Sequence, residues 1–193
     1  MIDSALNARN ASLKVKLTVK SAVSIGLIAL AVVLPLIFHA AFGAAGGQKW
    51  LPMYLPIMIG GCLLGAGWGA GVGALAPIAS FAVTSAFGTA MPTATRLPYM
   101  VAELAVFGAV GGLFSRAVYG KPWAAVFAVL LSAVAGRAAF MTVAAVFQTV
   151  SPITAQAAWL QIQAGLVGLA VQSAVAIVAV IITAVALKKS GKA

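Results

Sequence analysis

The 193-residue chain is 63% hydrophobic and only 7% charged. A soluble globular domain carries about a quarter charged residues, so this composition excludes that class and predicts an integral membrane protein. The formal net charge of +10 does not indicate a nucleic-acid-binding protein, because the basic residues fall in short clusters beside apolar segments rather than along one polar face.

The first membrane helix is expected over about residues 17–42, after a polar, basic tail formed by residues 1–16. The apolar segment is too long for a signal peptide, and no convincing cleavage site follows it. Ala22, Gly26 and Ala29 lie close to one face of this helix, and small residues at such spacing let another helix approach closely. The approaching helix belongs either to this chain or to a partner protein.

The second and third helices are expected over about residues 50–65 and 67–87, after a glycine-rich loop at residues 43–49. The apolar stretch that contains both is too long for one span, and a run of glycines from Gly65 to Gly73 divides it. We assign this run to helix turning and packing rather than to nucleotide binding, because no strand precedes it and no charged ribose partner follows it.

The last three helices are expected over about residues 97–116, 123–148 and 159–187, with a proline- and threonine-rich loop at residues 88–98 before the first of them. Six spans place both ends of the chain on one side of the membrane. Nine of the twelve basic residues then lie on that side, namely Arg9, Lys14, Lys16, Lys20, Arg116, Lys121, Lys188, Lys189 and Lys192. The positive-inside rule therefore predicts cytoplasmic termini on a single all-α membrane domain, residues 1–193.

Two charged residues are expected at membrane depth, Glu103 in the fourth helix and Arg137 in the fifth. A carboxylate facing lipid costs about 2.5–3.5 kcal/mol, so Glu103 is expected to face protein or a watery cavity. The helix rise places the two residues about 10 Å and about 16 Å below the outer ends of their helices, and long side chains can close that difference. Two interpretations stay open: an internal ion pair, or a ligand site that uses one or both charges.

Polar and small residues recur at helical spacing on the last three helices, which together are expected to surround a ligand. The candidate substrate-binding residues are Arg96, Met100, Glu103 and Phe107 on the fourth helix, Arg137 and Met141 on the fifth, and Trp159, Gln163 and Gln172 on the sixth. Trp50 and Tyr54 are expected at the membrane interface, where amphipathic aromatic residues concentrate.

No catalytic site and no metal site are expected. An intramembrane hydrolase would need a nucleophile and a base, and the one histidine, His39, has no companion acid in its own segment. A metal site would require His39, Cys62 and Glu103 to converge from separate helices without any recognisable ligand spacing.

Short segments along the chain are typical of one known family. They are Leu51-Pro-Met-Tyr-Leu-Pro-Ile-Met-Ile-Gly-Gly, Met100-Val-Ala-Glu-Leu-Ala with Gly108 and Gly111-Gly112, Gly136-Arg137, and Gly168-Leu-Ala-Val-Gln172. In order and spacing they resemble the substrate-binding S components of energy-coupling factor (ECF) vitamin transporters, over about residues 16–189. The resemblance implies a six-helix protein of a prokaryotic plasma membrane that captures a vitamin or vitamin precursor from outside.

The resemblance also implies where the ligand and the partners bind. The ligand is expected near the outer surface beneath the loops at residues 43–49 and 88–98, and Ala22, Gly26 and Ala29 are expected to contact a transmembrane coupling protein. Two cytoplasmic ATPases on that partner use ATP, whereas this chain binds no cofactor. A stand-alone small-molecule transporter, or a proton-coupled exporter that uses Glu103, remains the alternative.

Overall fold

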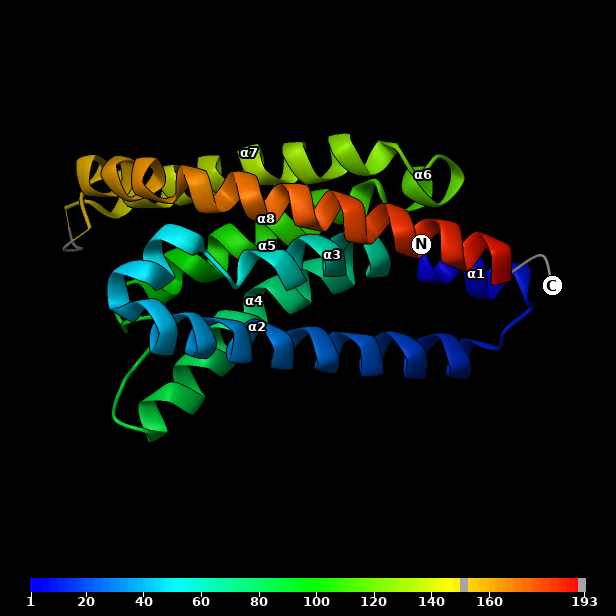
Figure 1. Ribbon diagram of the computed structural model, residues 1–193, viewed down its shortest axis with the longest axis horizontal. Coiled ribbons are helices and arrows are strands. Elements are labelled where there is room, and N and C mark those ends of the chain that lie inside the picture. Colours follow the sequence, from blue (N-terminus) through cyan, green and yellow to red (C-terminus); the bar gives the residue numbers. More distant parts are fainter. Residues whose placement is uncertain (150–152, 191–193) are drawn as a thin grey trace.

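The computed structural model describes residues 1–149 and 153–190, and of residues 44–48 it describes the backbone. The described chain contains α-helices and no strand: α1 Ile2–Ala8, α2 Leu13–Trp50, α3 Tyr54–Leu64, α4 Ala66–Ala86, α5 Leu97–Leu113, α6 Ser115–Gly120, α7 Ala124–Phe147 and α8 Ala155–Ser190. The helices α2, α3, α4, α5, α7 and α8 alternate in direction along the long axis of an elongated bundle (Figure 1). The amino terminus and the end of α8 lie at the same end, called the terminal end below.

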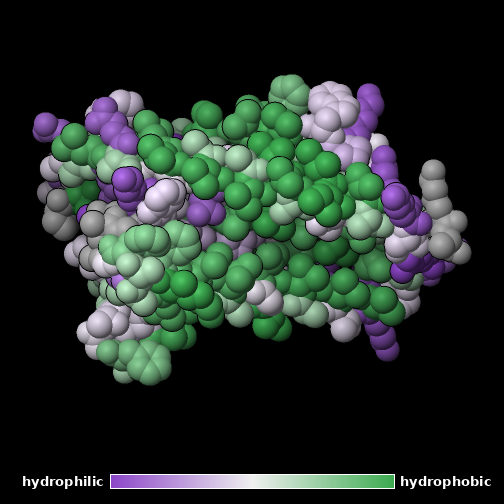
Figure 2. Space-filling model, in the orientation of Figure 1, coloured by the Kyte–Doolittle hydropathy of each residue, from purple (hydrophilic) through white to green (hydrophobic). Residues whose placement is uncertain are grey.

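Four helical segments of the described chain are long and apolar enough to cross a membrane by length and composition: Leu13–Gly43, Ala66–Ala86, Ala124–Phe147 and Ala155–Ser190. The helices α3 and α5 are apolar but shorter, with 11 and 17 residues. Hydrophobic side chains cover most of the middle of the face shown in Figure 2, and hydrophilic ones gather toward its ends. An apolar surface of this extent is compatible with membrane insertion.

Residues 1–16, expected as a polar, basic tail, are largely helical, because they contain α1 and the start of α2. Met1 and Ile2 are buried against the core because their side chains are apolar. Asp3 in α1 pairs with Lys20 of α2, which ties the short helix to the bundle. The tail therefore covers part of the terminal end.

The predicted loop at residues 43–49 is helical instead. Helix α2 continues to Trp50 across a kink at Gly43, whose φ of 70° is a conformation that glycine adopts without a steric penalty. The glycine-rich composition thus marks a change of helix direction rather than a loop. The chain reverses only after Trp50, and Leu51 there has a φ of 50°.

Glycines set the closest helix contacts, as the run from Gly65 to Gly73 predicted. Gly65 has a φ of 91° and forms the turn between α3 and α4. Gly69 of α4 and Gly108 of α5 face each other so closely that a Cβ on either residue would overlap the backbone of the other. Small residues at this contact let α4 and α5 pack backbone to backbone.

Candidate functional site

A cavity of about 310 Å³ lies at the end of the bundle opposite the terminal end. Its walls come from α2, the α2–α3 linker, α3, α4, the α4–α5 loop, α5 and α8. The polar lining includes His39, Tyr54, Arg96 and Gln161, and Met100 contributes an apolar surface. Small-molecule sites typically have volumes of about 300–1,000 Å³ and combine apolar walls with a few polar groups, so this cavity has the size and composition for a small ligand.

The α4–α5 loop forms one wall of the cavity and is held there by α4. The Ser80 hydroxyl donates to the Met91 carbonyl at 2.8 Å, and the Met91 N–H donates to the Thr84 hydroxyl, also at 2.8 Å. Ser80 and Thr84 are each 1% exposed, so these hydrogen bonds are shielded from solvent. The loop expected over residues 88–98 is therefore a fixed wall of the cavity.

A buried charged cluster, made of Tyr54, Glu103 and Arg137, lies beside the cavity. Glu103 is 0% exposed, and the Tyr54 hydroxyl donates to its Oε2 at 2.7 Å. Arg137 Nη1 lies 2.9 Å from Glu103 Oε1, so the long side chains close the depth difference expected from the sequence. Tyr54 belongs both to the cluster and to the cavity wall, and it is the direct link between the two.

Aromatic packing fixes the position of Tyr54. Its ring meets Phe107 edge-on at a centroid distance of 5.1 Å, and the Arg137 guanidinium carbon lies 4.9 Å from its centroid. Gly136 has no side chain, which leaves room for the Phe107 ring against α7. Phe107, predicted as a ligand contact, is fully buried and does not line the cavity. It packs against Tyr54 of the cluster instead.

The guanidinium of Arg137 is not fully satisfied by this pairing. Its contact with Glu103 lacks the alignment of a hydrogen bond, and neither Nε, Nη1 nor Nη2 has a hydrogen-bond partner among the described residues. Nη2 lies 3.4 Å from the point that a Cβ at Gly165 would occupy, and the Leu51 side chain of the cavity wall lies beside the same point. Unsatisfied buried donors cost about 1–3 kcal/mol each, so the cluster retains unused hydrogen-bonding capacity near the cavity.

The remaining predicted ligand residues do not line the cavity. Met141 packs in a small cluster at the end of α7, and Gln172 donates to the last carbonyl of α2 at 3.3 Å. Trp159 and Gln163 lie on the exposed face of α8. The residue through which α8 contributes to the cavity is Gln161.

Tyr54, expected at the membrane interface, is 2% exposed, so its side chain lies in the interior of the protein. A buried tyrosine hydroxyl usually requires a hydrogen-bond partner, and Glu103 provides one. No local sequence pattern indicates this pairing, because Glu103 lies 49 residues further along the chain. His39 lines the cavity, and its Nδ1 has no hydrogen-bond partner within the described chain.

The small residues on α2 point away from the bundle. Ala22, Gly26 and Ala29 are all exposed, and a Cβ at Gly26 would meet nothing within 4 Å. They therefore do not mediate contacts between helices of this chain. This face is available to lipid or to a partner.

The site is thus a cavity with a basic wall residue, Arg96, next to the buried Glu103–Arg137 pair. Comparison of the chain with protein-family models, with curated proteins and with solved structures gives no match.

Proposed function

We propose that this protein is the substrate-binding S component of an ECF-type importer and captures a vitamin or vitamin precursor in the cavity. The observation that carries the proposal is the cavity itself, which lies at one end of the bundle next to Tyr54 and its buried partners. On the other side of that cluster, the bundle is filled by packed side chains such as Leu104 and Phe107. A site of this kind suits capture from one side of a membrane and needs a partner for release to the other.

The proposed topology has six spans, cytoplasmic termini and the cavity facing outward. The alternating course of α2, α3, α4, α5, α7 and α8 supports it, as does the burial of nine of the eleven residues of α3, which makes this short helix an interior one. Arg9, just after α1, and the basic residues of the start of α2, of α6 and of the end of α8 belong to segments at the terminal end, which supports assigning that end to the cytoplasm.

The lining favours a ligand with an apolar body and an acidic group. Arg96 supplies a positive charge, while His39, Tyr54 and Gln161 offer hydrogen-bonding groups. None of the described residues that line the cavity is acidic. A guanidinium binds a carboxylate or phosphate through charge-assisted hydrogen bonds, whereas the methionine and proline side chains of the wall suit an apolar ring or chain.

The position of Glu103 bears on the alternative, a proton-coupled exporter. Such a transporter needs a carboxyl group that exchanges protons with water. Glu103 is 0% exposed and has Arg137 and Tyr54 at its two oxygens, so this arrangement favours a structural and ligand-positioning role. Transport would then depend on a coupling protein, whose ATPases use ATP, docked on the exposed face of Ala22, Gly26 and Ala29.

The proposal is tested on protein purified from membranes without a proton gradient. Mass spectrometry of the released small molecules is expected to find one compound at a near-equimolar amount. Met100→Trp, which fills the cavity, is expected to abolish its retention, whereas Leu160→Trp on the exposed face of α8 serves as the matched control. Absence of any bound compound, equal retention by both variants, or proton-driven flux by the chain alone would contradict the proposal.

A further inference from the structure

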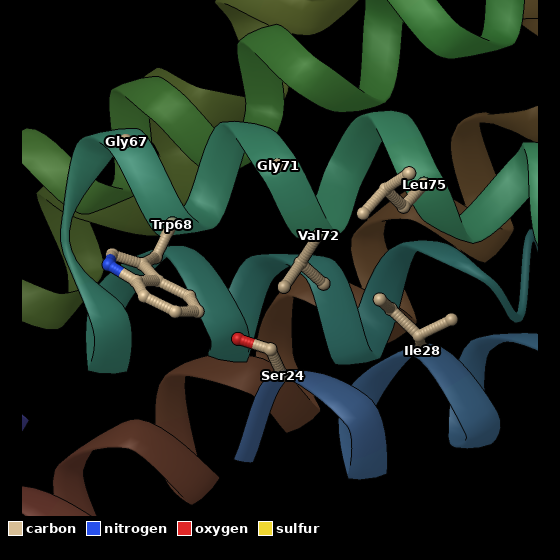
Figure 3. A pocket seen from close by; sticks show the side chains of 7 residues that line it. All are labelled: Ser24, Ile28, Gly67, Trp68, Gly71, Val72 and Leu75. Carbon is tan, nitrogen blue, oxygen red and sulfur yellow. The ribbon is translucent and has the colours of Figure 1, made fainter. Parts of the chain in front are cut away.

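A second hollow lies on the flank of the bundle, between α2 and α4. It has a volume of about 320 Å³, and Ser24 and Ile28 of α2 face Trp68 and Leu75 of α4 across it (Figure 3). The groove exists because Gly71 presents no side chain there, and a Cβ at this position would meet nothing within 4 Å. It shares no lining residue with the ligand cavity.

One end of this groove is basic. Lys20 lies one helical turn before Ser24 on α2, and its ammonium is 5.9 Å from the centroid of the Trp68 ring. Asp3 already pairs with Lys20, but Lys16, a further turn toward the terminal end, has no acidic partner among the described residues. At helical spacing Lys16 shares a face of α2 with Lys20, so an unpaired positive charge is expected one turn beyond this end of the groove.

Next to the basic end of the groove lies Ser24, whose buried hydroxyl has no hydrogen-bond partner among the described residues. Ser24 is 7% exposed. The side chain points from α2 toward α4 and into the groove (Figure 3). Beyond it the lining is apolar, with Ile28, Val72 and Leu75.

The groups along α2 follow one another at the helix repeat. Lys20, Ser24 and Ile28 are four residues apart, which corresponds to about 6 Å of rise for each step. A charged group, a hydroxyl and an apolar surface are thus met in that order from the terminal end toward the middle of the bundle. A glycerophospholipid presents the complementary order, with a phosphate, ester carbonyls just below it and then acyl chains.

We propose that this groove binds one anionic glycerophospholipid. Its phosphate lies at Lys16 and Lys20, an ester carbonyl accepts from the Ser24 hydroxyl, and one acyl chain runs along Gly71 and Leu75. Trp68 lies at the level of the headgroup, a position that indole rings favour in membranes. A zwitterionic lipid such as phosphatidylcholine carries the same phosphate but also a quaternary ammonium that Lys16 and Lys20 repel, so the site selects for net negative charge. The inference requires the chain to lie in a membrane and does not depend on the identity of the cavity ligand.

The experiment counts lipids retained by the protein. The full chain is reconstituted in nanodiscs of equal parts dioleoylphosphatidylglycerol and dioleoylphosphatidylcholine, released into the gas phase and examined by native mass spectrometry. One phosphatidylglycerol is expected to stay bound. Lys16→Gln combined with Lys20→Gln is expected to lower its retention about tenfold, and Ser24→Ala is expected to lower it severalfold.

Two glycine variants form a matched pair. Gly71→Leu fills the groove, whereas Gly26→Leu adds the same side chain to the outer face of α2, and a Cβ at either position meets nothing within 4 Å. Retention of phosphatidylglycerol is expected to be lost in Gly71→Leu and kept in Gly26→Leu. Equal retention of the two lipids, or unchanged retention in Gly71→Leu, overturns the proposal. The lysine variants test the site independently if Gly71→Leu does not fold.

Discussion

Replacing Glu103 and Arg137 singly and together separates the structural role of the buried pair from its role in ligand binding. Glu103→Gln keeps the shape of the side chain and removes its charge. Because Arg137 Nη1 lies 2.9 Å from Glu103 Oε1 and both residues are buried, the change leaves a buried guanidinium without its counter-charge. Breaking a buried ion pair in this way costs about 3–5 kcal/mol, and Arg137→Met is expected to cost a similar amount.

The double variant is expected to recover stability but not affinity. With Gln at position 103 and Met at position 137 no buried charge remains unpaired, and replacement of a buried pair by uncharged groups is often neutral. In the proposed complex, however, the ligand contacts Tyr54, whose hydroxyl donates to Glu103 at 2.7 Å and whose ring lies against the Arg137 guanidinium. Loss of the carboxylate and guanidinium that hold Tyr54 in place is expected to weaken ligand binding by about 1.5–3 kcal/mol, which corresponds to a ten- to hundredfold weaker affinity.

The assay measures two quantities on the same purified variants. Thermal unfolding reports stability, and titration with the molecule that copurifies with the wild-type protein reports affinity per folded molecule. We expect the double variant to approach the wild-type melting temperature while its affinity stays at least tenfold weaker. Unchanged affinity per folded molecule in all three variants would mean that the pair only connects α5 and α7 and has no role in ligand binding.

Three further predictions test the topology, the partner face and the helix packing. Thr93→Cys in the cavity wall is expected to react with an impermeant thiol reagent from outside, and Lys121→Cys only after the membrane is opened. The reverse pattern would reject cytoplasmic termini. The native Cys62 is buried and does not interfere. Gly26→Leu is expected to reduce copurification with the coupling complex while ligand binding stays intact; unchanged copurification would show that this face meets only lipid. Gly108→Ala is expected to destabilise the protein by about 1–3 kcal/mol, because its Cβ would overlap α4, whereas Gly71→Ala is expected to unfold near the wild-type temperature; equal melting temperatures would contradict the close contact.

Composition and apolar segment length were sufficient to predict an all-helical chain with the character of a membrane protein. Helix α7, Ala124–Phe147, and helix α4, Ala66–Ala86, begin and end within one residue of their expected positions. These boundaries are readable because charged, glycine-rich or proline-rich segments separate long apolar ones. The pairing of Glu103 with Arg137 was one of two open interpretations, and it follows from the scarcity of buried charges in the chain.

The orientation of each helix about its own axis was decided only by the tertiary structure. Periodicity shows that Trp159 and Gln163 are on one helix with Gln161, but the helices are apolar on nearly all sides, so the sequence pattern gives little indication of which face is buried. In the fold, Gln161 lines the cavity and the other two are exposed. The role of Tyr54 has the same origin, because its acceptor, Glu103, is 49 residues away and is brought to it by the packing of α3 against α5.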